Sequence, residues 1–146
     1  TLTALWEDDS RVLIAHVGDS RAYRLRENAL TQITQDHSIV AELVRNHVIT
    51  PEMAKTHPYR NVITRAVGID PTVQVDVLFE DKQLDDLWLV CSDGLYNMVG
   101  DEEILQTLTD LEDDKAADRL LELALANGGT DNISFVLCRV MEVSAK

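Results

Sequence analysis

Runs in which apolar and polar residues alternate predict β-strands in both halves of the chain. Residues 1–6 and 11–17 are two such runs, and the acidic segment 7–10 between them is expected to join them as a hairpin. A third run follows closely at 22–26, so three antiparallel strands are expected in succession. Further strands are expected at 73–79, 87–91 and 133–143.

Apolar residues spaced three and four apart predict helices between the strands. Ser38 is the expected N-cap of one short helix, and Thr50, which stands before Pro51, is the expected N-cap of another. A longer helix is expected to begin at Asp101, and the last helix to end at Asn127. The apolar faces of these two longer helices are expected to cover a sheet. The first face consists of Ile104, Leu105, Leu108 and Leu111, and the second of Ala117, Leu120, Leu121, Ala124 and Leu125.

The order of these elements favours an α+β fold. Strands and helices are grouped along the chain, whereas a doubly wound parallel sheet would alternate strand and helix throughout. The sequence has no internal repeat and no linker, and 146 residues are enough for one domain with a hydrophobic core. A single domain is therefore expected.

Several large or sulfur-containing side chains within the strand runs are expected in the core. The aromatic residues are Trp6, Phe79 and Trp88. Cys91 and Cys138 have no ligand spacing and are expected to be buried, reduced thiols. Reduced thiols fit a reducing cytosol, so a cytoplasmic location is expected.

The charge balance excludes some partners and admits others. Thirteen lysines and arginines oppose 26 aspartates and glutamates, which gives a net charge of −13. A negative field of this size disfavours nucleic acid and anionic membranes as partners. Carboxylates are also the ligands that hard divalent cations prefer.

Three aspartates stand beside glycines at the ends of predicted strands: Asp19, Asp93 and Asp131. Aspartate and glycine together also form ordinary turns, which is the simpler interpretation of each one alone. Taken together, they are typical of a metal site, because glycine lets the backbone aim short carboxylates at a common point. Asp93 and Asp131 can meet only if the strands beside them run antiparallel and close together, with the two long helices on the outer face.

Other polar residues have structural interpretations that compete with functional ones. His37 could be a general acid, but a structural hydrogen bond is the favoured interpretation. Arg21 and Arg65 could bind phosphate, yet arginines in such loops more often hold carboxylates or carbonyls. Zinc is disfavoured because the cysteines and the four histidines are scattered along the chain.

Five short motifs follow one another along the chain. They are 16–23 (HVGDSRAY), 30–38 (LTQITQDHS), 61–68 (NVITRAVG), 89–95 (LVCSDGL) and 129–134 (GTDNIS). In order and spacing they resemble the motifs of bacterial PP2C-type (PPM family) metal-dependent protein serine/threonine phosphatases, and the resemblance extends from about residue 3 to residue 140.

The resemblance implies a sandwich of two antiparallel β-sheets flanked by helices, with a metal centre at one end. Asp93 and Asp131 match ligands of one of two core Mg²⁺ or Mn²⁺ ions, and Asp19 matches a ligand of a weaker third ion. Residues from about 38 to 60 match a flap that varies with substrate. The implied reaction is hydrolysis of phosphoserine and phosphothreonine by a metal-activated water, in proteins phosphorylated by a bacterial serine/threonine kinase. No side chain of this chain is expected to act as a catalytic group itself.

The sequence departs from the family pattern in one respect. An Asp-Gly-x-Gly-Gly-His segment and a phosphate-binding arginine of the family have no counterpart, since the only adjacent glycines are Gly128 and Gly129. The chain also begins within a strand-like run. Residues 1–146 are therefore interpreted as the C-terminal portion of a phosphatase domain that is inactive alone, as one of two complementing chains, or as a non-catalytic relative.

The non-catalytic alternative is a module that binds phosphoproteins or assembles through exposed strand edges. A phosphatase acting on an anti-sigma-factor antagonist shares the fold and is a further alternative. The Asp-His-Ser and Thr-Arg-Ala segments, at 36–38 and 64–66, favour the branch that opposes kinases.

Overall fold

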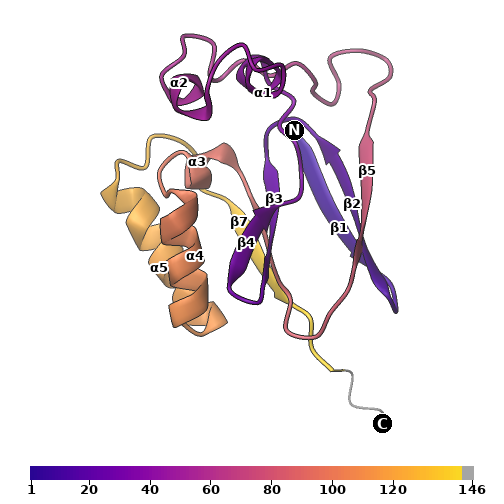
Figure 1. The fold of residues 1–146 in the computed structure, drawn as a ribbon, viewed down its shortest axis with the longest axis vertical. Helices are drawn as coiled ribbons and strands as arrows, with labels where there is room; N and C mark the ends of the chain where they lie inside the picture. Colours follow the sequence, from indigo (N-terminus) through magenta and orange to yellow (C-terminus); the bar gives the residue numbers. More distant parts are fainter. Residues whose placement is uncertain (143–146) are drawn as a thin grey trace.

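Two antiparallel sheets stack face to face in the computed structural model, which describes residues 1–142 (Figure 1). This arrangement confirms the expected sandwich. The first sheet has the order β1-β2-β5 and the second the order β4-β3-β6-β7. The strands are β1 (Leu2–Glu7), β2 (Arg11–Val17), β3 (Arg21–Arg26), β4 (Ala29–Gln32), β5 (Asp76–Asp81), β6 (Leu87–Cys91) and β7 (Phe135–Arg139).

The expected succession of three paired strands is wrong in one detail. β1 and β2 form the predicted hairpin, but β3 belongs to the other sheet and pairs with β4 and β6. The chain changes sheets at Gly18, whose φ of 111° is a conformation that residues with a β-carbon rarely adopt. Sequence patterning missed β4, and β5 begins three residues later than expected. β7 confirms that a last strand is present, but it is shorter than expected, beginning at Phe135 and ending at Arg139, and residue 143 of the predicted run lies outside the described residues.

The described residues form five helices, which lie at the end and along one side of the sandwich (Figure 1). Ser38 and Thr50 cap α1 and α2 as expected, each accepting a backbone N–H with its side-chain oxygen. α3 was not expected. The long helices α4 and α5 run along the outer side of the second sheet. The helices are α1 (Ile39–Arg45), α2 (Pro51–Lys55), α3 (Asp93–Tyr96), α4 (Asp101–Asp110) and α5 (Asp113–Ala126).

Two clusters of buried side chains hold these layers together. One lies between the second sheet and α3, α4 and α5, and the other lies between the two sheets around Trp88. The buried face of α5 is rotated from the expected one: Leu121 and Leu125 are exposed, and Ala116 takes the place expected for Ala117. The buried line in α5 is Ala116, Leu120 and Ala124, a strict spacing of four.

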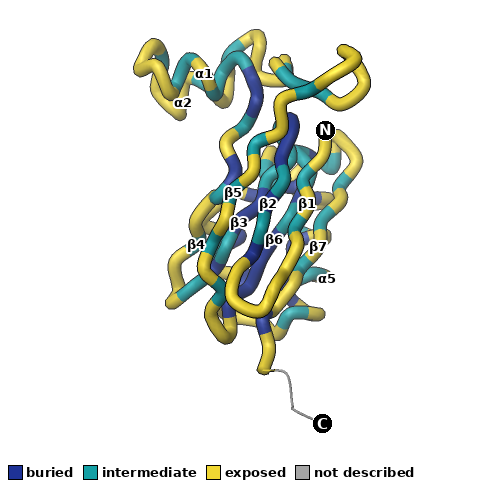
Figure 2. The backbone as a smooth tube through the Cα atoms, turned by 90° about the vertical axis from the view of Figure 1, so that its right-hand side faces the viewer, coloured by how far each residue is buried: buried dark blue, intermediate teal, exposed yellow. Residues whose placement is uncertain are grey.

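Three residues expected in the core are exposed. Trp6 is 73% exposed and Phe79 is 57% exposed. Figure 2 shows that β1 and β5, the strands that carry them, consist of exposed and intermediate residues. Both flank Leu13 in register on the outer face of the first sheet, which no described helix covers. Cys138 is exposed because it lies on the edge strand β7, whereas Cys91 on the central strand β6 is buried. Both cysteines are free thiols.

Candidate metal centre

The strands beside Asp93 and Asp131 are neighbours in the second sheet. β6 and β7 pair antiparallel, and Cys91 lies opposite Phe135. Asp93 follows Cys91 by two positions and Asp131 precedes Phe135 by four, so both aspartates lie beyond the same end of this strand pair. The expected antiparallel arrangement is therefore confirmed, as is the placement of the helices on the outer side of that sheet.

Short hydrogen bonds hold the Asp93 and Asp131 loops together. The Ser92 backbone N–H donates to the Ser134 carbonyl at 2.9 Å, and the Ser92 hydroxyl donates to the Asn132 carbonyl at 3.0 Å. Gly94 packs directly on the same carbonyl, because a β-carbon at this position would lie 2.3 Å from the Asn132 oxygen. Glycine is therefore required next to Asp93 for this close approach.

The third aspartate reaches the same end from the connection between β2 and β3. Tyr96 in α3 donates its hydroxyl to the Asp19 backbone carbonyl at 2.9 Å, which ties that connection to the helix that begins at Asp93. Burial raises the pKa of Asp19, and the negative charge of Asp93 raises it further. These two carboxylates therefore repel each other, and a cation near both would relieve the repulsion.

Arg21 contacts three side chains at this end of the sandwich. Its guanidinium donates to both carboxylate oxygens of Asp36, at 3.0 Å from Nε to Oδ1 and 2.7 Å from Nη2 to Oδ2. It also donates to the Tyr23 hydroxyl at 3.0 Å and lies 3.6 Å from the centre of the Tyr96 ring. The interpretation that Arg21 holds a carboxylate is confirmed. Arg65 likewise binds Asp76, at 2.7 Å.

Asp131 is the most exposed of the three aspartates. Its Oδ1 accepts the backbone N–H of Asn132 at 2.6 Å. Within residues 1–142, no three histidine, cysteine, aspartate or glutamate side chains stand close enough to enclose a metal ion. The described side chains therefore fit part of a ligand set, made of the oxygen donors that Mg²⁺ and Mn²⁺ prefer, and leave room for water and further ligands.

Sequence reasoning found the aspartates but missed the residues that place them. Tyr96 is one, and it contacts both Asp19 and Arg21. The serine before Asp93 could have indicated a short helix starting there, with Tyr96 on its first turn. Asp36 is another, because it holds the guanidinium of Arg21 against the Tyr96 ring.

The α1–α2 segment rises at the same end of the molecule as α3 (Figure 1). Its two ends are held together at the base. Ile39 donates its backbone N–H to the Val62 carbonyl at 3.0 Å, and Thr64 donates to the His37 carbonyl at 2.7 Å. The segment is thus a loop with a closed base that stands beside the candidate centre.

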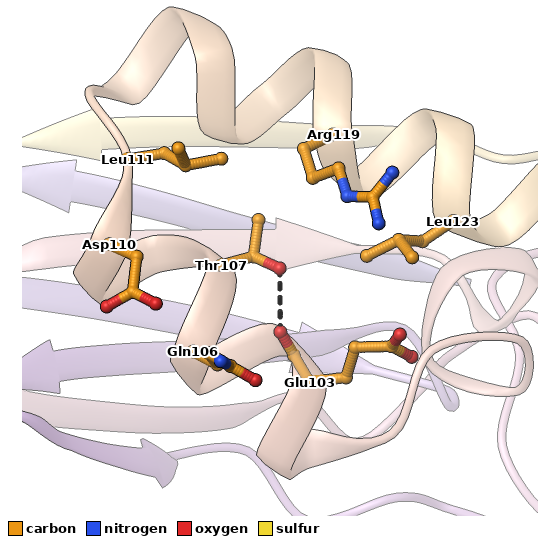
Figure 3. A pocket seen from close by; sticks show the side chains of 7 residues that line it. All are labelled: Glu103, Gln106, Thr107, Asp110, Leu111, Arg119 and Leu123. Carbon is orange, nitrogen blue, oxygen red and sulfur yellow. Dashed lines mark hydrogen bonds between the residues drawn. The ribbon is translucent and has the colours of Figure 1, made fainter.

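A separate groove lies between α4 and α5 (Figure 3). Its floor includes Thr107, whose hydroxyl donates to the Glu103 carbonyl at 2.7 Å. It contains none of the three aspartates. The other residues that line it are Gln106, Asp110, Leu111, Arg119 and Leu123.

Comparison with known proteins relates this chain and its fold to serine/threonine phosphatases. No family model matches the chain. The chain is 43% identical to the serine/threonine protein phosphatase PstP of Mycobacterium tuberculosis over 97% of this chain and 27% of PstP. It is 44% identical to the serine/threonine phosphatase Stp of Listeria welshimeri over 94% of this chain and 55% of Stp.

Solved structures agree with the sequence comparison. A crystal structure of M. tuberculosis PstP matches with a TM-score of 0.91 and 41% identity, over 96% of this chain and 59% of that chain. The catalytic domain of PstP in complex with two manganese ions matches with a TM-score of 0.86 and 40% identity, over 96% and 58%. The chain is therefore a homologue of the bacterial PP2C-type serine/threonine phosphatases. It spans between about a quarter and three fifths of the relatives it matches.

No helix within residues 1–142 combines the length and the apolar composition needed to cross a membrane.

Proposed function

We propose that residues 1–146 form the C-terminal portion of a metal-dependent protein serine/threonine phosphatase domain, which removes phosphate from phosphoserine and phosphothreonine in proteins. The observation that carries the proposal is the meeting of the Asp19 connection with the Asp93 and Asp131 loops at one end of a phosphatase-like sandwich. The proposed substrates are proteins phosphorylated by a bacterial serine/threonine kinase in the cytoplasm, where two free cysteines stay reduced.

The proposed cofactors are two core Mn²⁺ or Mg²⁺ ions and a weaker third. The manganese complex of PstP supports this choice. Asp93 and Asp131 would hold a core ion, and Asp19 would hold the third. A bound divalent ion supplies charge stabilisation and an activated water. The chain's own contribution is to orient these carboxylates, through the hydrogen bonds of Ser92 and Tyr96.

The α1–α2 segment is the proposed flap, with residues 38–60 as its variable part. Its charge balance differs from that of the whole chain, because Arg45, Lys55 and Arg60 outnumber Glu42 and Glu52 there, whereas the chain has a net charge of −13. A flap with local positive charge beside an acidic metal site would admit a phosphorylated segment that the rest of the surface repels.

A non-catalytic module that binds phosphoproteins or assembles through its edges is the second candidate. Two observations favour it. The described side chains do not close a metal site, and β1 is an edge strand beside an apolar outer face.

A chimera separates the two candidates. The matching part of M. tuberculosis PstP is replaced by this chain, and hydrolysis of a phosphothreonine peptide is measured with Mn²⁺. We expect turnover, and we expect Asp93→Asn in the chimera to lower it at least a hundredfold, while Asp9→Asn in the exposed β1–β2 turn leaves it unchanged. A chimera that folds and binds Mn²⁺ without turnover would favour the non-catalytic module.

A further inference from the structure

His37 is a buried histidine whose bonds reach three separate segments. Its exposed fraction is 3%. Its Nδ1 lies 3.1 Å from the Gly18 backbone nitrogen, and its Nε2 lies 3.0 Å from Oδ2 of Asp76. Its backbone carbonyl accepts the Thr64 N–H at the base of the α1–α2 segment. The confirmed structural hydrogen bond is thus one of a set that links the Asp19 connection, β5 and the proposed flap.

The partners of His37 determine which ring nitrogen carries the proton. A backbone N–H can only donate, so the Gly18 N–H requires an unprotonated Nδ1. The ring must then carry its proton on Nε2, which donates to Asp76. Burial alone would raise the pKa of Asp76, but hydrogen bonds from His37 and Arg65 lower it, so this carboxylate is ionised and accepts. The Arg65 guanidinium also lies 3.1 Å from Nε2, but it can only donate and has a shorter bond, 2.7 Å, to Oδ1 of Asp76. The Gly18 and Asp76 bonds are satisfied together only by a neutral Nε2–H tautomer, in which Arg65 bonds to Asp76 and not to the ring.

Gly18 is held by His37 through both of its backbone polar groups. Besides the bond to the ring, the His37 backbone N–H donates to the Gly18 carbonyl at 2.7 Å. Gly18 immediately precedes Asp19 and has a positive φ, so its peptide planes set the direction in which the Asp19 carboxylate points. Tyr96 fixes the carbonyl of Asp19 on the other side. The position of Asp19 is thus set by His37, through Gly18, on one side and by Tyr96 on the other.

The same ring is unsuited to proton transfer with a substrate. Both nitrogens are occupied by protein groups, and the neighbouring His16 ring covers it at a centroid distance of 4.8 Å. Burial is the largest cause that lowers the pKa of His16, so the ring beside His37 favours its neutral form as well. A general acid would need a free nitrogen that faces the site, and His37 has none.

We propose that His37, as the neutral Nε2–H tautomer, is a positioning residue that orients Asp19 through Gly18 and links it to the base of the α1–α2 segment at Thr64. The proposal deepens the proposed function, because it assigns a residue that aligns a metal-binding carboxylate with the flap. Residues that orient a ligand from behind typically change metal affinity or activity 10- to 100-fold when they are replaced.

The first test needs no substitution and no metal. Long-range ¹H–¹⁵N correlation spectra of the chain report which nitrogen of each histidine carries a proton. We expect the Nε2–H pattern for His37 at neutral pH. An Nδ1–H tautomer or an imidazolium would overturn the proposal.

The second test separates the two ends of the ring with a matched pair of variants. His37→Asn keeps an acceptor near the Nδ1 position, and His37→Gln keeps a donor near the Nε2 position. We expect His37→Asn to leave the Gly18 and Asp19 amide signals close to those of the wild type and His37→Gln to shift them. Equal shifts in both variants would indicate a packing role only and would contradict positioning.

The third test uses the PstP chimera. We expect His37→Gln to lower kcat at least tenfold with little change in KM, and His37→Asn to retain most of kcat. Equal kcat values for the two variants would contradict positioning. An inactive parent chimera would contradict the proposed function instead, while the tautomer and the amide signals would still decide the role of His37.

Discussion

The two sheets of the sandwich differ in what covers their outer faces. In the second sheet, Leu87 and Leu89 of β6 pack against the helices, while Trp88 between them packs against the first sheet. In the first sheet, only the inner face is buried, and Trp6 and Phe79 are exposed on the outer one. A strand buried on both faces has a continuous apolar sequence, whereas one buried on a single face should alternate with polar residues.

The outer face of the first sheet departs from that expectation. Many of its residues are apolar although they face solvent, and Trp6, Leu13 and Phe79 form one continuous row across β1, β2 and β5. A contiguous apolar surface of this kind is typical of a contact site. The second sheet therefore owes its stability to the helices of this chain, and the outer face of the first sheet adds little to it.

The largest predicted effect tests this contrast directly. Leu120 is fully buried between α5 and the second sheet, so Leu120→Ala should lower the free energy of unfolding by about 2–5 kcal/mol. Trp6→Ala removes a larger side chain but should change it by no more than about 0.5 kcal/mol, because Trp6 is exposed. Urea denaturation measures both. Comparable losses for the two variants would show that the outer face of the first sheet is covered in solution.

The second prediction concerns the end where β6 and β7 leave the sheet. Gly94→Ser should cost about 1–3 kcal/mol and weaken Mn²⁺ binding, because its β-carbon would overlap the Asn132 carbonyl. Gly100→Ser is the matched control, since nothing lies within 4 Å of a β-carbon there and serine is a favourable N-cap for α4. Thermal unfolding and Mn²⁺ titration of the two variants provide the comparison. Equal destabilisation of the two variants would mean that Gly94 does not pack closely on the Asn132 carbonyl in solution.

A smaller effect is expected from the apolar face and the free edge of β1. We predict that the chain self-associates at high concentration, since β1 has one strand neighbour within the described residues. Light scattering after size exclusion should show a dimer whose dissociation constant rises roughly tenfold in Trp6→Glu, which corresponds to ~1.4 kcal/mol. Leu121→Glu, on the exposed face of α5, should leave the dissociation constant unchanged. A strictly monomeric chain at every concentration would contradict this prediction.

Local patterning in the sequence predicted the elements better than their partners. Helix caps such as Ser38 and the strand 87–91 follow from residues close together in the chain, and the structure confirms them. The assignment of β3 to the second sheet depends on pairing with β6, more than 60 residues away, which no local pattern contains. Exposure of Trp6 was missed for a similar reason, because a strand with apolar residues on both faces does not reveal which face is covered.

The candidate site shows the same division. Ordered motifs indicated Asp19, Asp93 and Asp131, because chemistry restricts those positions to short carboxylates beside glycine. The supporting contacts could not be predicted, since they join distant segments: Tyr96 with Asp19, and His37 with Gly18. The motifs therefore predict the candidate ligands, whereas the residues that hold these ligands in place are known only from the fold.

The smallest predicted effect concerns the charge of Asp19. Burial and the charge of Asp93 raise the pKa of Asp19, so the folded state binds its proton more tightly than the unfolded state does. Stability from this group is therefore present at low pH and is lost as the pH rises through the folded pKa. Without metal, Asp19→Asn should stabilise the chain at neutral pH by roughly 0.5 kcal/mol, a small value because the carboxylate is partly exposed and screened.

The pH and metal dependence of this variant distinguish charge repulsion from other causes. The advantage of Asp19→Asn over the wild type should shrink as the pH falls and Asp19 becomes protonated. Mn²⁺ should reverse the order at neutral pH, since a bound cation stabilises only a chain that retains the carboxylate. Asp9→Asn removes the same charge from an exposed turn and should show neither effect. If Asp9→Asn matched Asp19→Asn, net charge would explain the gain, and the two carboxylates would not share a cation site.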